Sequence, residues 1–275
     1  MRIYGIDFTS TPTSRKPITC LVADLDDNLL STRQLLRWHS LSEFEDFLSS
    51  PGPWVGGFDF PFGQARRFIE TIGWLPDWQQ YVGYVASLSR AEFRQQLDTY
   101  RQARASGDKE HRRYCDQKAG AISPQKLYGV PVGLMFFEGA KRILNSQVSI
   151  PGLRPTVDHR SAFETYPALV ARRYIGRRTY KQDSKDKQNQ TQANARHALW
   201  QILHSPQLEA DFGLRLENQL SLCNDPSGDE LDALLCAIQA GWAYLHNIET
   251  IYLNMGIDPL EGWIADPSLI DQTLS

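Results

Sequence analysis

The hydrophobic pattern at the start of the chain predicts three strands in close succession. Residues 2–9, 17–24 and about 29–38 are rich in Ile, Val, Leu and aromatic side chains. Turn-forming residues separate these segments, first at Thr11–Ser14 and then at Asp26–Asn28. Connections this short suit antiparallel neighbours, so we expect an antiparallel three-stranded meander.

The next segment predicts a helix and a fourth strand. Ser42 and Glu45 have the spacing of a capping box at the start of a short amphipathic helix. Pro51-Gly52-Pro53 ends that helix, and an apolar stretch then leads to Asp59. A strand reached through a helix lies parallel to its neighbour, so we expect it to join the meander by a parallel crossover.

The remainder of the chain alternates between helical and strand patterns. From about 64 to 146 the pattern is helical, with Ser89 and Glu92 capping a long polar helix, whereas the weak periodicity of 106–129 predicts a mobile or ligand-dependent loop. Strand character returns at 161–166, and Pro167 suits the first turn of the helix that follows. Further helices are expected at about 192–204 and 229–247. We therefore expect one domain, 1–275, with a helical insertion at about 64–160.

Composition indicates a soluble globular protein, because 41% of the 275 residues are hydrophobic and 22% are charged. Its four cysteines form no C-x-x-C pair, no leader pattern opens the chain, and the longest apolar run is too short to span a bilayer. These features predict a cytoplasmic protein without a membrane partner. The formal net charge of −3 hides an uneven distribution, since Arg215 is the only Lys or Arg between 207 and 275. Basic residues gather at 101–118 and 172–187, which indicates an acidic site flanked by basic surfaces.

Acidic residues stand at the ends of the predicted strands and at the start of an apolar helix. Asp7 ends the first strand, Asp59 the fourth, and Glu164 the strand at 161–166. Asp229 and Asp232 open the helix at 229–247. A carboxylate on an apolar element needs a partner, because an unpaired buried charge is strongly unfavourable. One or two hard cations such as Mg²⁺ could serve several of these carboxylates at once.

Each acid also has a structural interpretation. A strand-end aspartate is often a turn residue, Asp229 could charge or cap a helix N-terminus, and Glu164 could pair with Arg160 or Arg172. Asp232 is harder to explain in this way, because it lies on the same side as apolar residues of its helix. Glu230 lies on the opposite side and is expected to be solvated.

The order of elements and acidic motifs resembles a known family. A meander, a helix and then alternating strands and helices is the element order of the ribonuclease H-like fold. Gly5-Ile6-Asp7, Phe58–Gly63, Glu164–Pro167 and Asp229-x-x-Asp232-Ala233 together resemble the predicted RNase H-like nucleases catalogued as domain of unknown function 429. The last motif also resembles the corresponding helix of RuvC-type Holliday-junction resolvases. The resemblance implies an α/β fold with a mixed sheet and a metal-dependent nuclease activity; residues 64–160 contribute nothing to it.

Two-metal hydrolysis of a phosphodiester gives each acid an expected role. Carboxylates hold two cations about 4 Å apart, one of which activates water while the other stabilises the leaving oxygen. We expect Asp7 to bridge two Mg²⁺ or Mn²⁺ ions, Asp59 to bind one of them, and Asp232 to bind the other. Asp229 would bind that second ion or hold its water, and Glu164 would be a catalytic ligand or orient one.

The basic segments are expected to contact the phosphates of DNA or RNA. The sequence indicates neither the choice between DNA and RNA nor an oligomeric state. The candidate contacts are Arg112, Arg113, Lys126, Arg160, Arg177, Arg178 and Lys181.

Two other functions fit parts of the sequence. An actin-like ATPase or small-molecule kinase also begins with a strand ending in Asp and a Thr/Ser-rich turn, as in residues 7–11. Such proteins usually need a second lobe and late glycine motifs, and nothing after Gly176 resembles these. A non-enzymatic nucleic-acid-binding module with a structural acidic cluster is the other alternative. The six His residues lack the spacing of a zinc site, and no G-x-S-x-G elbow or phosphate-binding glycine loop occurs.

Overall fold

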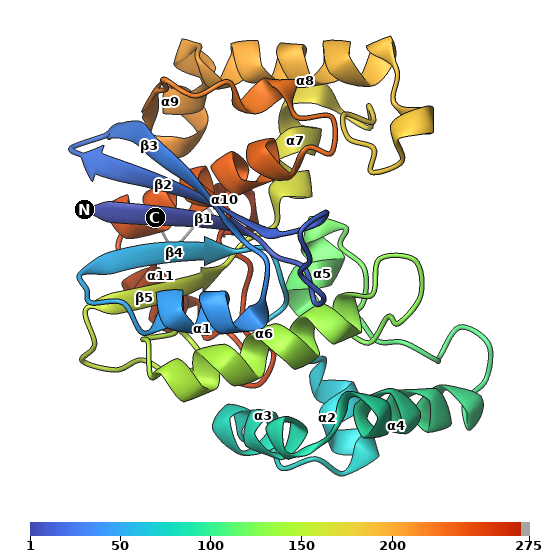
Figure 1. Cartoon of the computed structure of the whole chain (residues 1–275). Helices are drawn as coiled ribbons and strands as arrows, with labels where there is room; N and C mark the ends of the chain where they lie inside the picture. The colour runs from blue at the N-terminus through green and yellow to red at the C-terminus, as the bar shows by residue number, and fades with distance from the viewer. Residues whose placement is uncertain (271–275) are drawn as a thin grey trace.

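The first three strands pair as the predicted antiparallel meander in the computed structural model, which describes residues 1–270. The sheet has six strands in the order β5-β4-β1-β2-β3-β6, and helices cover both of its faces (Figure 1). The molecule is therefore an α/β protein with a mixed sheet. Its strands are β1 (Arg2–Asp7), β2 (Ile18–Asp26), β3 (Leu29–Trp38), β4 (Trp54–Phe58), β5 (Arg160–Glu164) and β6 (Arg215–Glu217).

The fourth strand joins the meander in parallel, as predicted, and β5 extends the parallel part. Ile6 of β1 pairs with Phe58 of β4, and Phe58 pairs with Glu164 of β5. β1, β4 and β5 thus run in one direction, and their carboxyl ends lie together at one end of the sheet. β6 was not predicted, because three residues are too few to show a period of two.

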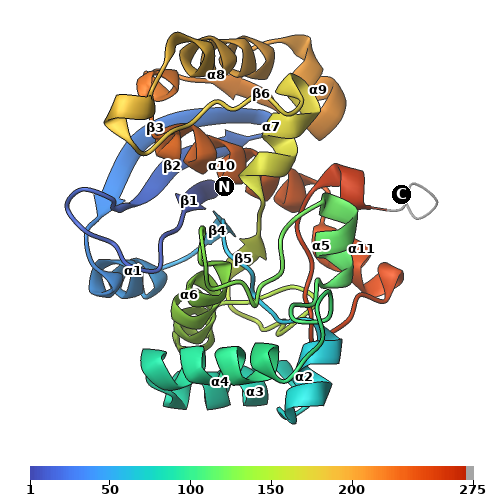
Figure 2. The ribbon, with the colours of Figure 1, turned by 90° about the vertical axis from the view of Figure 1, so that its right-hand side faces the viewer.

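Two groups of helices pack against the sheet. Helices α7 to α10 lie against one face, and α1 and α6 lie against the other, with α2 to α4 beyond α6 (Figures 1 and 2). Among residues 1–270, no helix combines the length and the apolar character needed to cross a membrane. The helices are α1 (Leu41–Leu48), α2 (Arg66–Ile72), α3 (Trp78–Ser87), α4 (Arg90–Gln102), α5 (Tyr114–Ala119), α6 (Val132–Ser146), α7 (Pro167–Ile175), α8 (Gln190–Leu203), α9 (Pro206–Phe212), α10 (Asp229–Leu245) and α11 (Ile248–Met255).

Two local predictions were wrong. The first helix begins at Leu41, and its capping box is formed by Ser40 and Glu43, two residues before the expected pair. The segment 106–129 is not an open loop, because it contains α5, and Arg113 and Asp116 within it are buried. The capping box of α4 and the proline-started α7 agree with the predictions.

Side chains alternate between two cores along the strands. Ile3 of β1 and Val55 of β4 belong to the core beneath α10, whereas Ile6 and Phe58 belong to the core beneath α1 and α6. This alternation follows from the period of two in a strand. It decides which face of the sheet each strand-end acid can reach.

Two glycines let α10 lie unusually close to the sheet. A Cβ added at Gly5 would come 1.9 Å from the carbonyl oxygen of Ala233, and one at Gly57 would come 2.4 Å from the carbonyl oxygen of Cys236. Both contacts are with the backbone of α10, so a larger side chain would push the helix away. The close approach places the N-terminus of α10 beside the ends of β1 and β4.

Candidate active site

Four of the predicted acids meet where β1 and β4 end. Gly5 and Gly57 face α10, so Asp7 and Asp59, each two residues further on, project to the same side of the sheet. Asp229 and Asp232 lie in the first turn of α10, on that side. The register of the parallel pair and the glycine contacts thus bring together acids that are more than 200 residues apart in the sequence.

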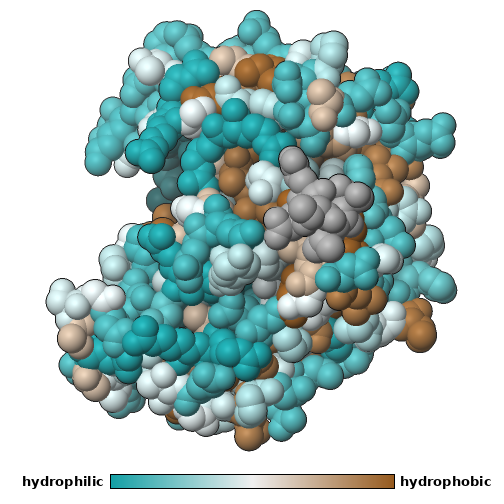
Figure 3. Space-filling model, turned by 180° about the vertical axis from the view of Figure 1, so that it is seen from behind, coloured by the Kyte–Doolittle hydropathy of each residue, from teal (hydrophilic) through white to brown (hydrophobic). Residues whose placement is uncertain are grey.

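A cleft of about 380 Å³ opens over these acids, and Asp7, Asp59 and Asp229 line it. Figure 2 views the molecule from the end of the sheet at which β1, β4 and β5 finish. These strand ends lie between α7 and α10 on one side and α6 on the other. Figure 3, seen from behind, shows a recess at that end of the molecule, at the left of the view. Asp232 does not line the cleft, because it is fully buried and accepts a hydrogen bond of 2.5 Å from the Tyr180 hydroxyl.

Two lysines neutralise part of the acidic cluster. Lys16 Nζ lies 2.7 Å from carboxylate oxygens of both Asp229 and Asp183, and the ammonium group of Lys181 contacts Asp232. The four clustered carboxylates and these two ammonium groups give a net charge of −2 when all six are ionised. Both lysines come from connecting segments, and the Lys181 side chain is 44% exposed although its ammonium group contacts the buried Asp232.

Burial and mutual repulsion favour the protonated acids. Burial, and then the charges of Asp229 and Asp232, raise the pKa of Asp7 well above its usual range. Burial raises the pKa of Asp59 to about 7, against the opposing effect of Lys181. Burial also raises the pKa of Asp229, although Lys16 opposes that shift. The surroundings therefore do not compensate the charge of the fully ionised cluster, and part of that charge is removed by protonation.

The donor atoms suit a hard divalent cation, although the side chains are not arranged around one. Within the described residues, 1–270, no three His, Cys, Asp or Glu side chains are placed to hold a single metal ion. Two of the acids have other partners, since Asp232 is engaged by Tyr180 and Lys181, and Asp229 by Lys16. Carboxylates are the preferred ligands of Mg²⁺, and an ion of charge +2 would compensate the excess charge of the cluster. Metal binding at these residues thus requires at least one lysine to withdraw.

Glu164 does not join the other acids. It pairs with Phe58, so it projects to the opposite face of the sheet from Asp7 and Asp59. There its oxygens accept hydrogen bonds of 2.5 and 2.7 Å from the Arg113 guanidinium, and one also accepts from the Phe62 amide at 2.8 Å. The expected role of Glu164 as a catalytic ligand is replaced by a buried ion pair.

Replacing Glu164 with glutamine is expected to destabilise the fold by about 3 kcal/mol, because it leaves the buried Arg113 with a weaker partner. Urea denaturation measures this loss. Glu70→Gln is the matched control, since Glu70 is 56% exposed and pairs with Arg66, whose side chain is 42% exposed; its effect should stay below about 0.5 kcal/mol. Equal stability of the two variants would contradict the structural role of Glu164.

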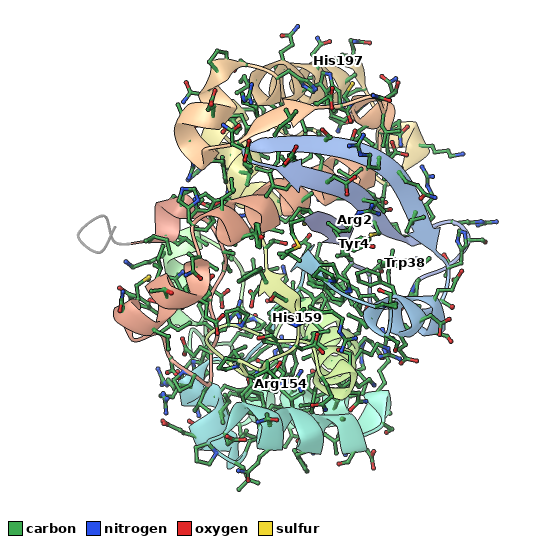
Figure 4. The ribbon with its side chains drawn as sticks, turned by 90° about the vertical axis from the view of Figure 1, so that its left-hand side faces the viewer. Arg2, Tyr4, Trp38, Arg154, His159 and His197 are labelled. Atoms are coloured by element: carbon green, nitrogen blue, oxygen red, sulfur yellow. The ribbon has the colours of Figure 1, made fainter. Side chains whose placement is uncertain are left out.

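The predicted phosphate contacts fall into three groups. Arg113 is 1% exposed and binds Asp116 and Glu164, so its assignment as a phosphate contact was wrong. The assignment of Arg160 as a phosphate contact was wrong as well, because Arg160 pairs with Asp158 at the start of β5. Figure 4 views the molecule from that end, where the adjacent His159 is labelled, away from the cleft.

The other basic candidates remain accessible. Arg112, Arg177 and Arg178 are exposed, and Lys126 is half-buried beside the ring of Tyr128. A groove of about 410 Å³ runs beside α7 and is lined by Arg172, Arg177, Arg178 and Lys181, with no acid among its described lining residues. Lys181 lines both this groove and the acidic cleft, so the two lie on either side of its side chain.

No protein-family model, curated protein or solved structure matches this chain. The geometry of the cleft and its surroundings is therefore the basis on which a function is assigned.

The sequence reasoning missed the roles of Lys16, Tyr180 and Gly5. Lys16 stands in an ordinary polar turn, and only the folded chain brings it to Asp229, 213 positions away. Lys181 was expected to contact substrate, and its contact with Asp232 joins residues 51 positions apart. Gly5 offered the best available signal, since a glycine inside a strand often marks a close backbone approach.

Metal-free protein is expected to lose stability as the pH rises from about 4 to about 7, because the folded state holds a proton on Asp59 that the unfolded state releases. The stabilisation that this proton gives is complete below the pKa of Asp59 in the unfolded protein. It is lost as the pH rises through the pKa of about 7 that Asp59 has in the folded protein. Urea denaturation in EDTA across this range measures it, and Asp59→Asn isolates it by making the slope shallower. Identical slopes for the two proteins would contradict the raised pKa of Asp59.

Proposed function

We propose that this protein is a divalent-metal-dependent nuclease of the ribonuclease H-like fold, which hydrolyses phosphodiester bonds of DNA or RNA. One observation carries the proposal: Asp7, Asp59 and Asp229, from two parallel strands and a helix N-terminus, line one cleft. The order of the sheet supports it, because an antiparallel meander extended by parallel strands is the arrangement that the resemblance to RNase H-like nucleases implies.

Asp7, Asp59 and Asp229 would hold Mg²⁺ or Mn²⁺, and Asp232 would join them after Lys181 withdraws. The cation would supply positive charge to the phosphodiester group and to the leaving oxygen. Lys181 stands between the acidic cleft and the basic groove, so once released it can contact a substrate phosphate. The groove lined by Arg177 and Arg178 would position the adjoining phosphates.

The turn after β1 favours a nuclease over an actin-like ATPase. In such an ATPase, hydroxyl groups of this turn would contact phosphate. Here Arg90 donates hydrogen bonds to the Thr11 hydroxyl at 2.9 Å and to the Ser10 carbonyl oxygen at 3.1 Å. The turn is thereby tied to α4, and Ser10 is buried although it lines the acidic cleft together with Thr9.

A screen of oligonucleotides tests the proposal. Labelled single-stranded, double-stranded and junction substrates of DNA and RNA are incubated with Mg²⁺ or Mn²⁺, and the Asp7→Asn protein serves as the control. We expect cleavage by the wild type only, and binding that weakens as salt is added. Metal binding without cleavage of any substrate would favour a binding module, and turnover of ATP would favour the kinase-like alternative.

A further inference from the structure

A second cavity, of about 240 Å³, adjoins the acidic cleft. The two share Asp59, Val130, Met135 and Lys181, so their openings meet beside the candidate metal ligands. This second cavity lies toward the start of α7 and α5, and nothing in the proposed hydrolysis uses it. Its chemistry indicates what could occupy it.

The cavity suits a neutral, largely apolar group. Val130 and Ile122, which line it, are 61% and 37% exposed. Three of the charged residues in its wall satisfy one another, because Arg113 binds both Asp116 and Glu164. The other two, Asp59 and Lys181, also line the acidic cleft, so unpaired charge is confined to the side that the cavity shares with the cleft. The volume is below the roughly 300–1,000 Å³ of pockets for drug-sized ligands, so one ring system fits better than a larger molecule.

Its wall also offers an aromatic surface. Tyr166 lines the cavity, and the Arg172 guanidinium lies 5.3 Å from the centre of its ring. A planar ring that stacks on Tyr166 matches this feature.

Lys181 links this cavity to both charged surfaces, since it also lines the acidic cleft and the basic groove beside α7. A ligand that spans the three must carry a neutral ring next to phosphate groups. We infer that the cavity is a nucleobase subsite, which holds the base of a nucleotide whose backbone phosphate lies over the acidic cleft. This inference rests on the proposed function and narrows it, because a base in the cavity can neither pair nor stack within a duplex. The substrate is therefore single-stranded nucleic acid or a nucleotide turned out of a helix.

The test compares a short single-stranded oligonucleotide with its abasic counterpart, in which every sugar lacks its base. Binding of each to the full chain is measured by fluorescence anisotropy in EDTA, where no cleavage occurs. Stacking on one aromatic side chain is expected to make the intact strand bind about fivefold more tightly, or better. Equal binding of the two strands, or no binding of either, would overturn the subsite.

Three variants test whether the tighter binding of the intact strand arises in this cavity. Tyr166→Ala should remove most of the difference between the two strands, whereas Tyr166→Phe, which keeps the ring, should retain it. Ile122→Trp narrows the cavity at a partly exposed position, so it should also reduce the preference even if Tyr166→Ala folds poorly. Tyr244→Ala is the matched control, because Tyr244 is 43% exposed near the far end of α10. A Tyr166→Ala protein that weakens both strands equally would contradict the subsite.

Cleavage separates this inference from the proposed function. With Mn²⁺ present, efficient cleavage of the abasic strand would overturn the subsite and leave the nuclease intact. A clear preference for the intact strand without cleavage of either would support the subsite and count against the nuclease.

Discussion

Replacing Gly5 with alanine is expected to destabilise the protein by about 3 kcal/mol or more, and to abolish activity in whatever protein still folds. The added Cβ would lie 1.9 Å from the Ala233 carbonyl oxygen and 2.4 Å from the Ala237 nitrogen. Both are backbone atoms of α10, so no side-chain rotation relieves the contact. The helix must move away from β1, and it carries Asp229 and Asp232 with it.

Gly83→Ala is the control for this change. Gly83 lies inside α3, and an added Cβ there meets no heavy atom within 4 Å. Alanine is a better helix former than glycine, so this variant should be more stable by up to about 1 kcal/mol. Urea denaturation compares both variants with the wild type. A Gly5→Ala protein as stable as the Gly83→Ala protein would show that α10 does not need its close approach to the sheet.

The strands could be predicted because their evidence is local. Runs of Ile, Val and Leu broken by turn residues indicate the meander, and the helix before Asp59 indicates the parallel crossover. The start of the first helix was harder, because Ser40–Glu43 and Ser42–Glu45 both have the capping-box spacing. The backbone decides between them, since Ser40 is extended and Ser42 already lies within the helix.

The candidate site could be predicted only in part. An acid belongs to it only if it stands at a strand end and if the register of that strand turns it to the correct face of the sheet. Asp7 and Asp59 each follow an inward-facing glycine by two residues, so they share a face of the sheet. Glu164 also ends a strand, but its pairing with Phe58 turns it to the other face. The sequence shows roughly where a strand ends, but it does not fix the pairing register to within one residue. A shift of one residue turns every side chain of the strand to the other face of the sheet.

The counter-ions were beyond the reach of sequence reasoning for a different reason. The sequence shows no set of buried lysines matched to the acids, and this favours a metal as their shared partner. In the fold, Lys16 and Lys181 approach Asp229 and Asp232 from distant connecting segments. Contacts of this kind leave no periodic signal. They also change the expectation for metal binding, because a cation must now compete with an ammonium group at Asp232.

Asp7→Asn is expected to reduce nuclease activity about a hundredfold or more while the fold is retained. Asparagine preserves the shape of the side chain and removes the charge that would hold the cation, and even partners of metal ligands cost 10–100-fold when lost. The same change should make metal-free protein more stable near pH 8. Burial and the charges of Asp229 and Asp232 disfavour an ionised Asp7, and asparagine has no charge to bury. Turnover with Mn²⁺ and urea denaturation in EDTA measure the two effects.

Two further substitutions on α10 test whether activity is lost only when an acid of the cluster loses its charge. Asp232→Asn should lose nearly as much activity as Asp7→Asn, because it removes the carboxylate that Lys181 must release to a cation. Glu230→Gln should leave turnover unchanged, since Glu230 pairs with Arg37 at the surface and not with the cluster. That pair corrects our expectation of a freely solvated Glu230, but surface pairs contribute little stability, about 0–1 kcal/mol. If Glu230→Gln abolished turnover while Asp232→Asn retained it, the side of α10 that faces the metal would be wrongly assigned, and the role of Lys181 with it.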